Sequence, residues 1–239
     1  MINVITTYHP DNPSLITPPQ YESAHKFLKN FNEGKKYTLN YDLILYWVYM
    51  HWLETRDQSL KCNDGFIKGK NETIIWDIGV SQQQDIYFLH GAIHIFSNGE
   101  FIEKCTWHDK GISIKKQVEK FIIQDKYPVF ISEGKVEHKR QRILNNGYLN
   151  RALVSLRSIS GNIFIFGHSL REEDAHIFDI INRNVDIKNI FVSIYGDIRN
   201  SNNQKIIEVI NNKWKQIPKN KKNYYLYDAE SAKVWNNSN

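Results

Sequence analysis

The chain has 239 residues, of which 41% are hydrophobic and 24% are charged, and its formal net charge is +5. This balance is typical of a globular protein that buries a core, and it argues against an intrinsically disordered chain. Two cysteines, Cys62 and Cys105, are too few for a disulfide framework or a four-thiolate zinc module. The mild excess of basic residues permits anionic ligands such as nucleotides or nucleic acid without requiring them.

The sequence predicts a cytoplasmic protein without a membrane partner. It contains no run of eighteen apolar residues that could span a bilayer. Residues 1–10 lack the basic start and the apolar stretch of a signal peptide. The small number of cysteines is also typical of a reducing compartment.

The first half of the chain predicts helices and short strands around a polar insertion. Residues 1–20 are polar and contain several prolines, so we expect loops there. Residues 55–85 are polar and punctuated by glycine, and are expected to form a lid, a subdomain or an irregular excursion. The expected elements are a helix over Tyr21–Phe31, a strand over Lys36–Leu39, a helix over Leu43–Leu53 with Asp42 as its N-cap, a strand over Ile86–Leu89 and a hairpin over Ala92–Cys105.

The second half alternates more regularly between helices and strands, and ends in a basic C-terminal segment, residues 205–239. Apolar strands of about five residues that alternate with longer helices predict one α/β domain over residues 1–239, with helices on both faces of a mostly parallel sheet. The expected helices are Gly111–Gln124, Lys135–Asn145, Tyr148–Ser158, Glu172–Asn182 and Ile206–Trp214, and the expected strands are Pro128–Ile131, Asn162–Phe166, Ile190–Tyr195 and Tyr224–Tyr227.

Polar residues and glycines follow four of the expected strands. Ligands of parallel α/β sheets bind at the carboxyl ends of the strands, so we expect these residues to form one polar rim suited to a nucleotide. Structural roles are open as well, since Asp42 can cap a helix and Gly167 can serve a tight turn. The segments are Asn40-Tyr41-Asp42, His90-Gly91, Gly167-His168-Ser169 and Gly196-Asp197.

Two further patterns argue less strongly for function. His90 and His94 have the i, i+4 spacing of two helix-borne metal ligands, but no third ligand is evident nearby, so no metal site is expected. Residues 135–142 and 213–222 are basic, and the second stretch is followed by tyrosines. Runs this short are more typical of a solvated surface than of a nucleic-acid site, so nucleic acid is an unlikely partner.

Three of the strand-end segments resemble motifs of sirtuin-like NAD-binding domains. Residues 37–42 (YTLNYD) resemble T-T-N-Y-D with Leu39 in place of the second Thr, and residues 89–91 resemble L-H-G. Residues 166–170 with Asp174 resemble the later G-x-S-L…D motif. The resemblance runs from about residue 20 to the C-terminus, and it is closer to a bacterial family of unknown function within that group, on residues 40–47, 89–96, 128–134 and 165–170.

This resemblance implies a three-layer, Rossmann-like fold and NAD chemistry. In such a site Asn40 positions a water molecule or the nicotinamide ribose, Asp42 supports the pocket, and His90 acts as a general base or polarises a ribose hydroxyl. Relatives of this kind cleave NAD to nicotinamide and ADP-ribose, some of them in antiphage defence. The residues expected to contact the nucleotide are Thr38, Gly91, Gly167 and Ser169.

The sequence departs from the family pattern in two respects. Without a four-cysteine zinc module, protein deacylation is not expected. Residues 1–40 contain Gly34 as their only glycine, so the glycine-rich turn of the family's first βα unit is expected to be absent. The chain is then a truncated or inactive form, or it depends on self-association or a partner chain for that unit. Three functions stay open: NAD glycohydrolase, a non-catalytic NAD or ADP-ribose sensor, and an interaction or nucleic-acid-associated protein that uses the basic C-terminal segment.

Overall fold

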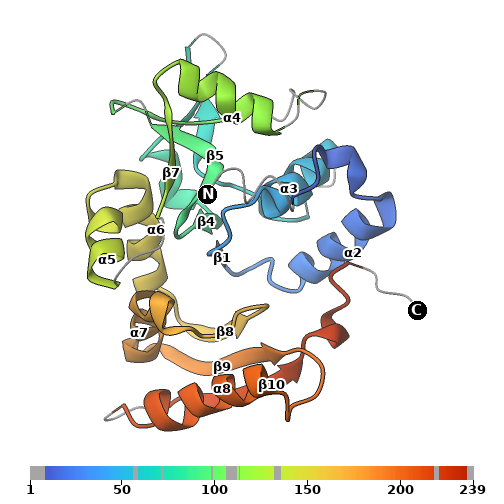
Figure 1. Ribbon diagram of the computed structural model, residues 1–239, viewed down its shortest axis with the longest axis vertical. Helices are drawn as coiled ribbons and strands as arrows, with labels where there is room; N and C mark the ends of the chain where they lie inside the picture. The colour runs from blue at the N-terminus through green and yellow to red at the C-terminus, as the bar shows by residue number, and fades with distance from the viewer. Residues whose placement is uncertain are drawn as a thin grey trace. The chain divides into compact units, whose positions relative to one another are not determined.

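The structure is a computed structural model and describes residues 9–55, 59–70, 73–97, 99–105, 112, 114–131, 136–217 and 221–235. It is an α/β protein with both parallel and antiparallel sheets (Figure 1). Contacts divide the chain into two compact units, where the sequence pattern predicts one domain. The first unit comprises residues 1–132, 146–152 and 234–239, and the second comprises residues 133–145 and 153–233.

The first unit contains a parallel strand pair and a five-stranded antiparallel sheet. The parallel pair is β1 (Lys36–Thr38) with β4 (Ile86–Phe88). The larger sheet has the order β2 (Phe66–Lys68), β3 (Ile74–Trp76), β6 (Ile102–Lys104), β5 (Gly91–Ser97), β7 (Tyr127–Phe130). The helical elements are η1 (Pro13–Leu15), α2 (Pro18–Lys29), α3 (Ile44–Glu54), η3 (Val80–Gln83), α4 (Ile114–Ile123) and the start of α6 (Gly147–Arg157).

Local sequence features explain where α2 begins and why α3 is buried. Helix α2 starts at a capping box. Oε1 of Gln20 accepts hydrogen bonds from the backbone N–H and the hydroxyl of Thr17, and Pro18 occupies the first turn. Helix α3 is apolar on most sides, and five of its side chains are buried, including Trp47 and Trp52. The helix predicted after Asp42 is therefore present, and its apolar surface is deeply packed.

The second unit is built on a three-stranded parallel sheet in the order β10 (Asn223–Asp228), β9 (Ile187–Ile194), β8 (Gly161–Ile165). Its helical elements are α5 (Val136–Leu144), the rest of α6, η4 (Glu172–Asp174), α7 (Ala175–Arg183), α8 (Ser201–Val209), the π-helical turn η5 (Ile210–Trp214) and η6 (Glu230–Ala232).

The two faces of this parallel sheet differ in character. Ile190 and Val192 of β9 are fully buried on one face. On the other face Phe191 stacks between Phe164 and Tyr225, with ring centroids 4.4 Å and 4.9 Å away. Phe164 and Tyr225 are each 46% exposed, so this face carries an aromatic row that the described part of the second unit leaves partly open.

The expectation of one mostly parallel sheet holds only in part. Parallel pairing is found between β1 and β4 and throughout the second unit, whereas the largest sheet is antiparallel. The physical reason is the short connections, because β2 and β3, like β5 and β6, are too close in sequence for the crossover that parallel strands require. Residues 66–76, expected to be an insertion, supply two strands of this sheet. The Asn98 turn of the predicted hairpin lies outside the described residues.

None of the helices in the described ranges combines the length and apolar character needed to cross a bilayer.

Candidate functional site

Strands β1 and β4 bring two of the predicted motif segments together. They pair in parallel, with Thr38 opposite Phe88, and the backbone N–H of Leu89 donates to the Thr38 carbonyl at 2.9 Å. Asn40 and His90 each follow their strand by two residues. The parallel register therefore places both at the same edge of the pair, as the sequence predicted for these two strands.

Tyr41 links this edge to the end of β7. Its hydroxyl donates to the carbonyl of Ile131 at 2.6 Å, and the N–H of Ile131 donates to the carbonyl of His90 at 2.8 Å. The rings of Tyr41 and His90 are stacked with centroids 6.3 Å apart. Ile131 thus bonds to the segments after both β1 and β4, through its carbonyl and its N–H. No local sequence pattern predicts that Tyr41 makes this link.

The two central residues of the site differ in exposure. Asn40 is exposed, and its backbone N–H donates to Oγ1 of Thr38 at 3.0 Å. Its side-chain amide makes no hydrogen bond within the described ranges, so it is available to a ligand or water. His90 is only 2% exposed. The arrangement offers one accessible amide beside a buried imidazole.

Asp42 acts on the start of α3. Its Oδ1 accepts a hydrogen bond from the N–H of Ile44 at 2.9 Å. Asp42 lies one residue before Leu43, which is the N-cap of this helix. Burial raises the pKa of Asp42, opposed by the Ile44 hydrogen bond and by His9. The Asp42 side chain thus binds the first turn of α3, but the N-cap is Leu43 and not Asp42 as predicted, and the role of Asp42 in a nucleotide pocket stays a prediction.

His9 contacts the same turn, and no local sequence pattern predicts this contact. Its Nε2 accepts from the N–H of Leu43 at 3.0 Å, so Nδ1 carries the proton and donates to the Pro10 carbonyl at 2.7 Å. Burial lowers the pKa of His9, which keeps the imidazole neutral in this role. The ring also packs edge-on against Trp47 at 4.6 Å.

Gly91 has a structural requirement that explains its presence after His90. Its φ is +75°, and a Cβ built there would lie 1.8 Å from the carbonyl oxygen of Val129 in β7. Only glycine permits strands β5 and β7 to approach so closely. The expected contact of Gly91 with a nucleotide is an additional role that this geometry does not require.

Gly167 and Ser169 lie in the second unit, after β8. Both are exposed, and Gly167 has a φ of +67° with no atom within 4 Å of a Cβ placed on it. The N–H of Gly167 donates to Oγ of Ser193 at 2.9 Å. The turn is therefore anchored to β9 and still leaves open space for a ligand to approach its backbone.

A cluster of polar side chains around Asp174 stabilises the turn after β8. His168 accepts from the N–H of Leu170 through Nδ1 at 2.8 Å, so its Nε2 donates to Asp174 at 3.2 Å. Lys139 of α5 also contacts Asp174, at 3.3 Å, and donates to the carbonyl of Glu173 at 3.0 Å. The basic pattern of residues 135–142 predicts a solvated surface, but the side chain of Lys139 is only 7% exposed.

The fourth predicted strand end, after β9, forms a self-contained surface turn. Asp197 accepts from the Arg199 guanidinium at 2.9 Å, and this hydrogen bond lowers the pKa of the Asp197 carboxyl. The carbonyls of Tyr195 and Asp197 both accept from the side chain of Asn203 at 2.8 Å. These contacts account for Gly196-Asp197 as a turn.

The predicted residues thus form two sets. Thr38, Asn40, Asp42, His90 and Gly91 lie at the ends of β1 and β4 in the first unit, whereas Gly167 and Ser169 lie in the second.

Comparison with known proteins yields one family. A family model described as a domain of unknown function (DUF4917) matches residues 1–235. No curated protein and no solved structure shows significant similarity to the chain.

Proposed function

We propose that this chain, which belongs to the DUF4917 family, is a cytoplasmic, Rossmann-like protein of sirtuin-like descent that binds NAD and hydrolyses it to nicotinamide and ADP-ribose. The observation that carries the proposal is the parallel pairing of β1 with β4, which puts the N-Y-D and L-H-G segments at one edge. Ligand binding at the carboxyl ends of parallel strands is the rule in such folds.

The residues at this edge suit cleavage of the N-glycosidic bond. Nicotinamide leaves with the bonding electrons as a neutral base, and the ribose carbon develops oxocarbenium character. The exposed amide of Asn40 orients the water that adds to this carbon and then releases a proton. His90 polarises a ribose hydroxyl through its imidazole.

The turn after β8, in the second unit, offers groups of the kind that bind the ribose and phosphates of a nucleotide. Gly167 leaves its backbone open to close approach, and the exposed hydroxyl of Ser169 can donate to a ribose or phosphate oxygen. The buried ion pair of Lys139 with Asp174 and the His168 contact hold this turn in shape.

A specific observation also favours a non-catalytic sensor of NAD or ADP-ribose. The Asp42 carboxylate, expected to support the pocket, is half-buried and accepts a hydrogen bond from the start of α3. If the described residues of this edge supply only an amide and an imidazole, the edge binds a ribose without strongly stabilising positive charge on it.

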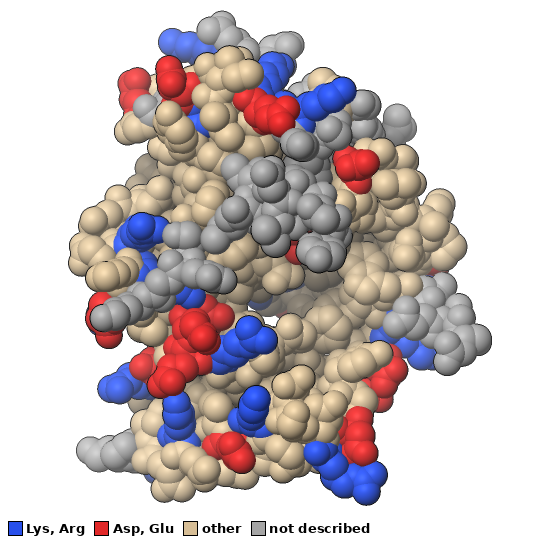
Figure 2. Space-filling model, in the orientation of Figure 1, with Lys and Arg blue, Asp and Glu red and all other residues tan. Residues whose placement is uncertain are grey.

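The nucleic-acid alternative has less support. In the basic stretch, Lys213 pairs with Glu172 at 3.4 Å, and the ammonium of Lys222 donates to the Asn182 carbonyl at 2.8 Å. On the face shown in Figure 2, basic and acidic side chains are interspersed and do not form one basic patch. Both observations favour a structural role for these lysines.

The test is to incubate the purified full-length chain with NAD and to measure nicotinamide by liquid chromatography, alongside calorimetry with ADP-ribose. We expect Asn40→Ala and His90→Ala to abolish release. The exposed Asn202→Ala and His138→Ala serve as matched controls and should retain it. ADP-ribose binding without release would support the sensor, and the absence of both release and binding would overturn the proposal.

A further inference from the structure

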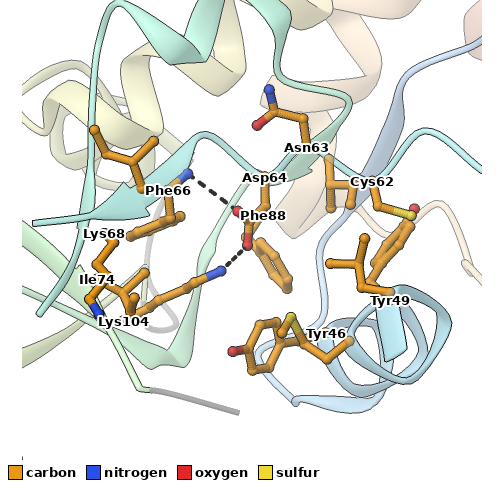
Figure 3. A pocket seen from close by; sticks show the side chains of 14 residues that line it. Tyr46, Tyr49, Cys62, Asn63, Asp64, Phe66, Lys68, Ile74, Phe88 and Lys104 are labelled. Atoms are coloured by element: carbon orange, nitrogen blue, oxygen red, sulfur yellow. Dashed lines mark hydrogen bonds and ion pairs between the residues drawn. The ribbon is translucent and has the colours of Figure 1, made fainter. Parts of the chain in front are cut away.

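We infer that the first unit holds a second binding site, which takes an uncharged molecule with two fused aromatic rings and one hydrogen-bond acceptor. The site is a pocket of about 290 Å³ lined by α3, the segment after it, and residues of β2, β3, β4 and β6 (Figure 3). None of the predicted nucleotide-contacting residues lines it. The inference is therefore independent of the proposed function.

The pocket has the size and walls of a small-molecule site. Its lining includes the buried residues Ile86 and Phe88, which are 1% and 2% exposed. Leu53, which is 53% exposed, and the exposed Lys68 lie where the pocket meets solvent. An apolar cavity of about 150 Å³ accommodates benzene, so this volume suits two fused rings. Predominantly apolar and aromatic walls with a few polar groups are typical of such sites.

The two charges inside the pocket neutralise each other, and the third charged lining residue, Lys68, is exposed at its opening. The Lys104 ammonium forms an ion pair with Asp64, and these side chains are 8% and 16% exposed. Asp64 also accepts from the N–H of Phe66 at 3.2 Å (Figure 3). The ammonium lies 4.9 Å from the ring centre of Tyr46 and 5.0 Å from that of Phe66. A charged ligand would bring an uncompensated charge into an apolar space, so the ligand should be uncharged.

Tyr49 supplies a donor that awaits an acceptor. The residue lines the pocket and is 3% exposed, yet within the described ranges its hydroxyl has no hydrogen-bond partner. Burial raises the pKa of Tyr49, so the hydroxyl stays protonated. A buried donor without an acceptor costs free energy, and an acceptor on the bound ring removes that cost. Burial also raises the pKa of Cys62, on the same wall, to about 12, so this thiol adds no charge.

The test compares three probes that share one ring shape, by ligand-observed NMR titration of the full chain at pH 8. Isoquinoline carries an acceptor, naphthalene does not, and 2-naphthoate is charged. We expect isoquinoline to bind about tenfold more tightly than naphthalene, with 2-naphthoate the weakest. Tyr49→Phe should abolish the preference for isoquinoline, while Tyr127→Phe, at a position 61% exposed outside the pocket, should retain it.

Location is tested by filling the pocket. Ile74→Trp on β3 and, as a second variant on the more exposed rim, Leu53→Trp should each weaken isoquinoline binding at least fivefold. Ile123→Trp, at a position 83% exposed on α4, is the matched control and should not. Binding that both pocket variants leave unchanged, tightest binding of 2-naphthoate, an isoquinoline preference that survives Tyr49→Phe, or no saturation at millimolar probe would each overturn the inference.

Discussion

Replacing Gly91 with alanine should destabilise the first unit more than a glycine substitution at any open turn. The new Cβ would lie 1.8 Å from the Val129 carbonyl oxygen, while real Cβ contacts stay above 3.0 Å. Strands β5 and β7 must therefore separate by roughly 1.2 Å at this point. That movement acts directly on the hydrogen bond from Ile131 to the His90 carbonyl, which is 2.8 Å long.

The magnitude follows from two contributions. A non-glycine residue at the positive φ of Gly91 costs about 1–2 kcal/mol. Loss of the Ile131–His90 hydrogen bond in a buried position adds about 1–3 kcal/mol. We therefore expect Gly91→Ala to lower the free energy of unfolding by about 2–5 kcal/mol, a large part of the stability of a typical domain.

The assay is urea unfolding followed by tryptophan fluorescence, since α3 carries buried Trp47 and Trp52 in the same unit. Gly99→Ala is the matched control, because Gly99 has a φ of +91° but no described residue lies within 4 Å of its added Cβ. The control should lose only the backbone contribution of about 1–2 kcal/mol. Equal losses for the two variants would refute the steric reasoning about β5 and β7.

Three further predictions concern the first unit. Asp42→Ala removes the cap on Ile44 and should lower the free energy of unfolding by about 0.5–2 kcal/mol, measured by urea unfolding; an unchanged midpoint would contradict the capping role. Lys104→Met leaves Asp64 buried without its partner and should cost about 3–5 kcal/mol, whereas adding Asp64→Leu should restore part of the loss; a double variant no more stable than Lys104→Met would argue against this account. Burial lowers the pKa of His94 well below its usual 6.5, so the unfolded chain takes up a proton that the folded chain does not, and stability should fall as pH drops below about 6.5. His94→Phe should flatten this fall in a series of urea midpoints from pH 8 to 5, and an identical slope in both proteins would exclude His94 as its source.

Local sequence patterns were sufficient for most helices and for the longer strands. The apolar residues of α2 and α7 follow the helical period, and β9 contains the apolar stretch 190–192, so the positions of these elements could be predicted within a few residues. Strands β2 and β3 have only three residues each within a polar stretch. So short a pattern does not distinguish a strand from a loop, which is why residues 55–85 were expected to be an insertion.

The candidate site likewise contains residues that local sequence patterns predict and contacts that they do not. Asn40, His90 and the turn after β8 could be identified because polar residues and glycine directly follow apolar strands. His9 could not, since it meets Leu43 across 34 positions of sequence, and neither could the Tyr41 hydrogen bond to Ile131 across 90 positions. Such contacts depend on how loops return to the strands, which no local pattern encodes.

The sequence by itself determined most of the helices and the longer strands, because periodicity and capping act over a few neighbouring residues. Only the tertiary structure decided that the strands separate into parallel and antiparallel sheets and that Lys104 meets Asp64 beside an open pocket. It also showed that Gly91 is required by the carbonyl of Val129. The physical reason is that strand pairing and burial are energies of the whole packed unit, and they join residues that are far apart along the chain.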